Sequence, residues 1–194
     1  MRKSSVERKT SETEVIINLD LDGSGIKKIS TGIKFFDHML EQLASHGYFD
    51  LDIQVTSHDR NEHHIVEDTA LTLGEAFKKA LSDKKGMNRY GYTLIPMDEA
   101  LSLCSIDLSG RPTCVFDAEI REECVSGLET ILIHHFFTSF SVGSLSTVHI
   151  KLLHCEDTHH KIESMFKAFA RALRTACSID KEHSEAIPST KGTI

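Results

Sequence analysis

The sequence lacks several features that would assign it to a common class. No uninterrupted apolar run in its 194 residues approaches the ~18 residues that a membrane helix needs. It is not basic, since 22 Lys and Arg stand against 29 Asp and Glu for a net charge of −7, which argues against a nucleic-acid-binding surface. The first residues are polar and charged, so we expect no secretory signal.

Paired cysteines are also lacking. The five cysteines are odd in number and scattered, and none forms a C-x-x-C pair. This pattern fits reduced thiols, most of them buried as small apolar side chains. We therefore expect a cytoplasmic protein of ordinary globular composition, with 40% hydrophobic and 26% charged residues.

Histidine, by contrast, is abundant and clustered. His63-His64-Ile65-Val66-Glu67 and His159-His160-Lys161-Ile162-Glu163 are two copies of His-His-x-x-Glu, 96 residues apart (159 − 63). One more histidine precedes each copy at almost the same distance, His38 by 25 residues (63 − 38) and His135 by 24 (159 − 135). A repeat with three histidines and one glutamate in each copy predicts a duplicated metal site.

The spacing within each copy has a physical consequence. On a helix, residues three and four positions apart share a face, so each glutamate is expected near both histidines of its pair. Adjacent histidines point about 100° apart and cannot easily chelate one ion, so each pair should hold two different ions, or one ion and a substrate. Imidazole and carboxylate together suit zinc, manganese or iron. The predicted ligands are three histidines and one carboxylate for each of two ions: His38, His63, His64, Glu67, His135, His159, His160 and Glu163.

A plainer explanation is two helix N-termini with incidental histidines, where a glutamate favours the helix dipole. One copy alone would leave that explanation about even with metal binding. Two copies with matched upstream histidines disfavour it.

Apolar periodicity predicts the same order of elements in both halves. The first half has strands near 15–21, 26–30 and 51–55, with helices over 35–45 and from 63. The second half has strands over 101–108, 113–120 and 148–152, with helices over 129–140 and from 159, after a linker from Asp83 to Pro96. The predicted fold is α+β, with two similar β-β-α-β-α halves (1–93 and 94–194) related by pseudo-twofold symmetry and sheets covered by helices.

Several stretches resemble the signatures of the imidazoleglycerol-phosphate dehydratase family. They span the chain from about Glu12 to Lys191 in the expected order, and the sequence departs from the common pattern at His134, where many members have glutamate. The stretches are Phe36 to Gly47, His63-His64-x-x-Glu67-Asp68, Asp107-Leu108-Ser109-Gly110-Arg111-Pro112, His135-Phe136-Phe137, His159-His160-x-x-Glu163 and Pro188-Ser189-Thr190-Lys191-Gly192.

The resemblance implies a hydro-lyase of histidine biosynthesis that dehydrates imidazoleglycerol phosphate to imidazole-acetol phosphate. It implies two manganese ions (Mn2+) per active site, and the family's metal ligands match the eight residues above. It also implies a duplicated βα fold and a shell of 24 copies with active sites shared between subunits.

The resemblance assigns further residues to a phosphorylated imidazole substrate. Glu12 matches the family's candidate base, although its residue context alone favours a solvent-exposed glutamate at the start of a strand. The phosphate-binding positions match Arg89, Arg111, Lys167, Ser189 and Lys191. Gln42 and His46 are expected to line the pocket, where the metal ligands His38, His63 and Glu67 also meet the substrate.

The proposed chemistry follows from the substrate. A neutral imidazole is a poor electron source for expelling a hydroxyl group, whereas two cations on its ring nitrogens would stabilise an imidazolate that can do so. Two alternatives stay open at this point. A di-metal hydrolase would usually need a carboxylate that bridges its ions, and no Asp-rich cluster accompanies these histidines. A non-catalytic metal store or sensor would leave Arg89, Arg111 and Lys191 without a role.

Overall fold

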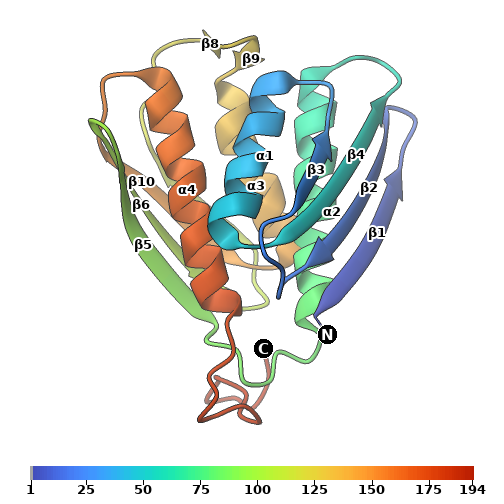
Figure 1. Cartoon of the computed structure of the whole chain (residues 1–194), viewed down its shortest axis with the longest axis vertical. Coiled ribbons are helices and arrows are strands. Elements are labelled where there is room, and N and C mark those ends of the chain that lie inside the picture. Colours follow the sequence, from blue (N-terminus) through green and yellow to red (C-terminus); the bar gives the residue numbers. More distant parts are fainter. Residues whose placement is uncertain (1) are drawn as a thin grey trace.

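Two four-stranded sheets form the outer sides of the molecule and four helices lie between them (Figure 1). This computed structural model describes residues 2–194. The elements of the first half are β1 (Lys3–Lys9), β2 (Thr13–Asp20), β3 (Lys27–Ser30), α1 (Lys34–Gly47), β4 (Asp50–Ser57) and α2 (Glu62–Leu81). Those of the second half are β5 (Tyr90–Met97), β6 (Ala100–Asp107), β7 (Thr113–Asp117), β8 (Cys124–Val125), β9 (Leu128–Glu129), α3 (Ile131–Ser144), β10 (Thr147–His154) and α4 (Thr158–Cys177).

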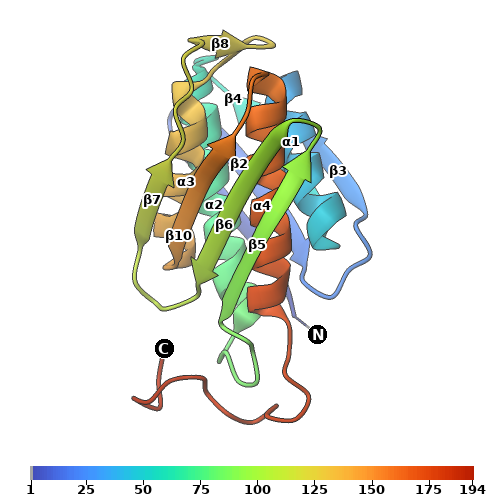
Figure 2. The same cartoon turned by 90° about the vertical axis from the view of Figure 1, so that its left-hand side faces the viewer.

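The two sheets have the same topology. Their strand orders are β1-β2-β4-β3 and β5-β6-β10-β7, and the short β8-β9 hairpin is an insertion between β7 and α3. In each sheet only the last pair is parallel, β3 with β4 and β7 with β10. The predicted duplicated α+β fold with helix-covered sheets is therefore confirmed. Figure 2 shows the second sheet from its outer side, with the helices behind it and the C-terminal segment below.

Each four-stranded sheet contains one strand more than the apolar pattern predicts, β1 in the first sheet and β5 in the second. β1 buries only Val6, so it has no period-2 signal to detect. β5 occupies most of what we expected to be a linker, and the expected boundary between residues 93 and 94 falls inside it. The glycine and the proline that suggested a linker are both compatible with this strand. Pro96 is tolerated because β5 is an edge strand. Gly91 is required because a Cβ there would stand 1.9 Å from the carbonyl oxygen of Ala172 in α4.

The third helix and the strand before it also differ from expectation. We expected a helix over residues 129–140, but α3 begins at Ile131, because Glu129 belongs to β9, and it continues to Ser144. β7 ends at Asp117. Of the five cysteines, only Cys104 and Cys177 are fully buried, and all five are unpaired within the described residues. The expectation that most of them are buried is therefore wrong.

The core lies between the helices and on the inner faces of both sheets. Phenylalanine rings join the helices of the two halves, with Phe136 of α3 packed 5.7 Å from Phe36 of α1 and 4.9 Å from Phe166 of α4 between ring centroids. Burying such rings contributes roughly 1.5–3 kcal/mol each, which makes the two halves one folding unit. No helix among residues 2–194 is long and apolar enough to span a membrane.

This arrangement puts both His-His pairs at one end of the molecule. α2 and α4 begin at the upper end in Figure 1, whereas the C-terminal segment lies at the lower end. The sheets and the helix bundle thus hold the first turns of these two helices at a common edge.

Candidate metal centre and active site

The two His-His pairs occupy the first turns of α2 and α4, as predicted. Each helix begins at a side-chain N-cap: Asn61 accepts a hydrogen bond from the backbone N–H of His63, and Asp157 accepts one from that of His160. Both bonds are 3.0 Å long. Such caps satisfy N–H groups that have no partner inside the helix, and they fix the direction of the first turn.

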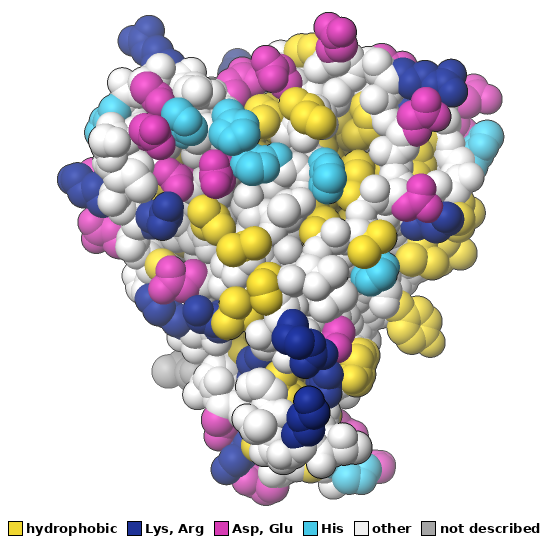
Figure 3. All heavy atoms as spheres, turned by 180° about the vertical axis from the view of Figure 1, so that it is seen from behind, with side chains coloured by type: hydrophobic (Ala, Val, Ile, Leu, Met, Phe, Trp, Pro, Cys, Tyr) yellow, Lys and Arg dark blue, Asp and Glu magenta, His cyan; other side chains and the backbone are white. Residues whose placement is uncertain are grey.

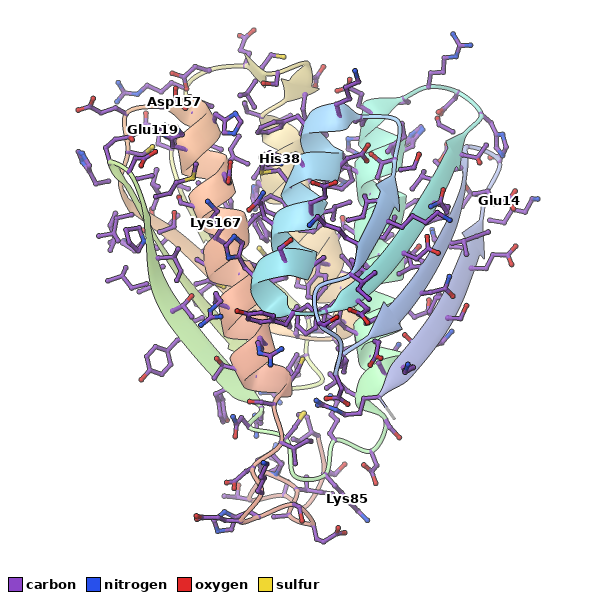
Figure 4. All side chains as sticks on the ribbon, in the orientation of Figure 1. Glu14, His38, Lys85, Glu119, Asp157 and Lys167 are labelled. Carbon is purple, nitrogen blue, oxygen red and sulfur yellow. The ribbon has the colours of Figure 1, made fainter. Side chains whose placement is uncertain are left out.

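One cluster of donor atoms forms between α1 and α4. The Nε2 atoms of His38 and His159 lie 3.2 Å and 3.0 Å from the same oxygen, Oε2 of Glu163. His159 and Glu163 are four residues apart on one helix face, and Glu163 is buried. In Figure 4 His38 extends from α1 beside the first part of α4.

A second cluster forms in the equivalent place between α2 and α3. The Nε2 atoms of His63 and His135 lie 3.4 Å and 3.5 Å from Oε2 of Glu67. The His135 nitrogen is buried and makes no hydrogen bond within the described residues. A buried nitrogen without a partner, aimed at a carboxylate and a second imidazole, fits a metal ligand.

The grouping of these donors differs from the expected one. Each lone histidine joins the His-x-x-x-Glu pair of the opposite half, His38 with the second copy and His135 with the first. Only the first histidine of each adjacent pair joins its glutamate in a cluster, whereas we expected each glutamate near both histidines of its pair. Each cluster has three donor atoms within 4.8 Å of one another, which leaves coordination positions for further ligands.

The second histidine of each pair contacts other carboxylates. Nδ1 of His64 lies 2.6 Å from Oδ2 of Asp59 and 3.8 Å from Oε2 of Glu12. Nδ1 of His160 lies 2.9 Å from Oε2 of Glu99. The hydrogen bonds to Asp59 and Glu99 raise the pKa of both imidazoles. The backbone N–H of Asp157, together with His160, lowers the pKa of Glu99 to about 2.

Neither Asp59 nor Glu99 was among the residues predicted from the sequence. Both had a detectable signal: Asp59 stands two residues before the N-cap of α2, and Glu99 directly precedes a strand, as Glu12 does. His134, which we left out of the site, stacks on Phe116 with ring centroids 4.9 Å apart.

Three other predicted residues surround the first cluster. Nε2 of Gln42 is 3.4 Å from Nδ1 of His38, and Nζ of Lys167 lies 2.8 Å from Oε1 of Glu163. His46 lies in the last turn of α1. Burial lowers the pKa of its imidazole most, and the charges of Lys167 and Arg171 lower it further. The imidazole of His46 and the ammonium of Lys167, which pairs with Glu163, thus border this end of the site.

The remaining predicted residues lie together at the opposite end of the molecule. Four of them line one cavity of about 660 Å³ beside the C-terminal segment: Arg89, Arg111, Ser189 and Lys191. Figure 3 shows one face of the molecule with histidine side chains gathered in its upper part and a group of Lys and Arg side chains low down.

The C-terminal segment has a defined path along this cavity. The Arg89 guanidinium donates to Oδ1 of Asp107 at 2.7 Å and to the carbonyl oxygen of Pro188 at 2.8 Å. The segment is held further by Gly86, which donates to the carbonyl oxygen of Ala186 at 2.8 Å.

The two groups are far apart in one chain. The backbone N–H of Arg89 donates to the carbonyl oxygen of Ala176 near the end of α4, whereas His159 lies in its first turn. These 17 residues of helix (176 − 159) correspond to about 25 Å at about 1.5 Å per residue. The structure therefore brings six of the eight predicted metal ligands together in two clusters, with Lys167 beside the first. The other four predicted phosphate-binding residues lie at the opposite end of the molecule.

Comparisons with known proteins agree over nearly the whole chain. The model of the family described as imidazoleglycerol-phosphate dehydratase matches residues 31–173. The protein of that name from Koribacter versatilis (strain Ellin345) is 47% identical, with all of both chains covered. The one from Acetivibrio thermocellus is 48% identical and covers 100% of this chain and 99% of its own length.

Solved structures give the same family. The imidazoleglycerol-phosphate dehydratase of Staphylococcus aureus superposes with a TM-score of 0.82 at 34% identity, covering 92% of this chain and 99% of its own. The enzyme of Pyrococcus furiosus, in complex with (S)-C348, gives a TM-score of 0.85 at 33% identity, with 97% and 100% covered.

Proposed function

The chain belongs to the imidazoleglycerol-phosphate dehydratase family, the hydro-lyases of histidine biosynthesis, and we propose that it eliminates water from imidazoleglycerol phosphate while two metal ions hold the imidazolate. The product would be imidazole-acetol phosphate. The observation that carries this proposal is the pair of equivalent clusters, each with two imidazoles and one carboxylate facing a common point.

The donors fit divalent manganese, for which nitrogen and oxygen ligands are suitable. His38, His159 and Glu163 would hold one ion, and His63, Glu67 and His135 the other. When bound, the two ions would supply the positive charge that stabilises the imidazolate ring as the hydroxide leaves. His64 and His160 would complete the two coordination shells from neighbouring copies, because each lies apart from the clusters of its own chain.

A shared site also follows from the position of the phosphate-binding residues. Imidazoleglycerol phosphate, a five-membered ring with a three-carbon phosphorylated chain, is much shorter than the ~25 Å of helix between His159 and Arg89. The cationic cavity of one copy must therefore meet the metal clusters of another if both act on one substrate. This supports active sites shared between copies, in which Arg89, Arg111 and Lys191 bind the phosphate together with Ser189. The assembly that we propose has 24 copies, a number that comes from the family resemblance alone.

Lys167 has a different place from these residues. Its Nζ lies beside Glu163 in the metal-ligand region. From there it can reach the chain or the phosphate of a substrate whose ring meets the first cluster, and Gln42 and His46 would border the same substrate.

Proton transfer needs a base that is not a metal ligand. Glu12 is the proposed base, and its Oε2 would take the proton from the carbon next to the one that loses its hydroxyl. The turn that carries Glu12 is well held: Thr10 Oγ1 accepts from the backbone N–H of both Glu12 and Thr13, and the hydroxyl of Thr13 donates to the buried carboxylate of Asp68. The side chain itself is about half exposed, so it can reach toward a substrate.

The decisive experiment is an assay of purified protein with imidazoleglycerol phosphate after loading with Mn2+. Formation of the ketone product is expected. A protein that holds its metal and forms no ketone would contradict the proposed reaction and leave a metal store or a hydrolase. We also propose that the protein works in the cytoplasm, because its five unpaired cysteines suit a reducing compartment.

A further inference from the structure

The two halves orient their second histidines with carboxylates from different places in the sequence. In the first half the orienting residue is Asp59, five positions before His64. The position 96 residues later (155 − 59, as 159 − 63) holds Cys155, which carries no carboxylate. In the second half the carboxylate on His160 belongs instead to Glu99, from the turn between β5 and β6.

The same two donors are satisfied in both halves. In the first half, Oδ1 of Asp59 accepts the backbone N–H of Asn61 at 3.0 Å while Oδ2 faces Nδ1 of His64 at 2.6 Å. In the second half, Oε1 of Glu99 accepts the backbone N–H of Asp157 at 3.0 Å while Oε2 faces Nδ1 of His160 at 2.9 Å. Asn61 and Asp157 are themselves equivalent, since each is the N-cap of its helix.

Glu99 is in turn the structural counterpart of Glu12. Each is the residue directly before the second strand of its sheet, β2 or β6, and both strands have eight residues. Yet Glu12 lies 3.8 Å from His64, beyond hydrogen-bond distance, because Asp59 already occupies Nδ1. The two equivalent glutamates thus have different partners.

We propose that Glu99 is a positioning residue that fixes the ring of His160 for metal binding, and that this role belongs to Asp59 in the first half, which leaves Glu12 free for proton transfer. A carboxylate on Nδ1 holds the proton there and leaves the lone pair of Nε2 for a metal ion. Only the Asp98 carboxylate, 3.8 Å away, lies near that Nε2 among the described groups. The inference rests on the proposed function, because it takes His160 to be a metal ligand.

Replacing Glu99 tests the hydrogen bond with little change in shape. In Glu99→Gln the amide oxygen can still accept from Asp157, but its NH2 group then faces Nδ1 of His160. The imidazole must turn away or move its proton to Nε2, and either change removes a metal ligand. Loss of an orienting partner typically costs about 10–100-fold in metal affinity.

The experiment titrates Mn2+ into the metal-stripped protein and counts ions per chain. Wild type is expected to bind two, whereas Glu99→Gln and Glu99→Ala should bind one of them about 10–100-fold more weakly. Glu119→Gln is the control, because it makes the same change in a carboxylate whose partner is Arg121 and not a histidine. Figure 4 labels Glu119 near the same end of the molecule.

A rescue variant separates positioning from a general effect on folding. Cys155→Asp places a carboxylate at the position that Asp59 has in the first half, within reach of both Asp157 and His160. In the Glu99→Ala/Cys155→Asp protein, the metal site that Glu99→Ala weakens should regain most of its affinity. This result would support the positioning role even if the single Glu99 variants fold poorly.

Two results would overturn the inference: unchanged affinity for both ions in Glu99→Gln, or a weak site that Cys155→Asp does not restore. Failure of the proposed function would look different. A wild-type protein that binds two ions but forms no ketone would contradict the reaction and leave the role of Glu99 in metal binding intact.

Discussion

The ring of His135 lies against the ring of His63, with centroids 4.3 Å apart and planes 30° apart, although the two histidines come from opposite halves of the chain. His38 and His159 form the reciprocal pair. Each half therefore supplies one donor to the other's cluster. Neither half could hold its three-donor site alone, so both sites depend on the packing of α2 on α3 and of α1 on α4.

The first prediction concerns this exchange. His135→Ala should remove one Mn2+ per chain, the ion of His63 and Glu67, and leave the other ion bound, because His135 contributes to one cluster only. Metal content after desalting, measured by mass spectrometry, checks this. His134→Ala is the control, because the ring of His134 stacks on Phe116 and belongs to neither cluster. Equal losses of metal in the two variants would contradict the assignment.

The second prediction concerns the histidines outside the clusters. His64→Ala and His160→Ala should each lower metal content and activity together, by at least about 100-fold in activity, while circular dichroism of the chain is unchanged. If these residues bind ions held by neighbouring copies, the mass of the assembly in light scattering should fall as well. Full activity in either variant would mean that the ligand is wrongly assigned.

The third prediction separates the base from the metal ligands. Glu12→Gln should lower kcat by about 10²–10⁴-fold with both ions still bound, because an amide cannot accept the proton. Glu14→Gln is the matched control, as that exposed carboxylate pairs with Lys9 instead; it is labelled in Figure 4. A Glu12 variant with wild-type kcat would remove this residue from the mechanism.

The fourth prediction concerns the cationic cavity at the lower end. Lys191→Ala should raise KM roughly 10–100-fold with metal content unchanged, since a hydrogen bond to a charged group contributes about 1.5–3 kcal/mol. Lys85→Ala removes a charge from the same end of the molecule, where Lys85 pairs with Asp83, and should leave KM unchanged. A shift in kcat alone would instead place Lys191 outside substrate binding.

The fifth prediction concerns pH and the turn that follows β2. Oδ1 of Asp50 accepts the backbone N–H groups of Ser24, Gly25 and Ile26 at 2.8–3.1 Å. These bonds, those from Ser24 and Ile26 most, lower the pKa of Asp50 below its ordinary value near 3.8. Because the folded pKa is lower than the unfolded one, this stabilisation is present above about pH 4 and is lost as the pH falls through the folded pKa.

Asp50→Asn should therefore lower the free energy of unfolding near neutral pH, and the difference from wild type should shrink below pH 4. Urea unfolding at several pH values measures both. Asp52→Asn, two residues along the same strand, is the control, since Asp52 accepts only from the Gln54 side chain. A difference that does not change with pH would mean that the charge of Asp50 does not stabilise the turn.

The helices of the site and the six donors that meet in the two clusters could be predicted from the sequence, because they depend on local features. The His-His-x-x-Glu spacing, the helical apolar stripes and the N-caps at Asn61 and Asp157 act within one or two turns of chain. The duplication was readable for the same reason, as a fixed offset between local patterns.

Which donors meet depends on how the helices pack in three dimensions. The pairing of His38 with Glu163 and of His135 with Glu67 follows from the packing of helices from opposite halves, which no spacing along the chain specifies. The edge strands β1 and β5 became visible only through their hydrogen bonds to β2 and β6, because β1 buries a single apolar residue and β5 contains Gly91 and Pro96. Likewise, Glu99 takes the place of Asp59 because a turn between distant strands brings its carboxylate to His160, a contact set by the sheet and not by the sequence neighbourhood.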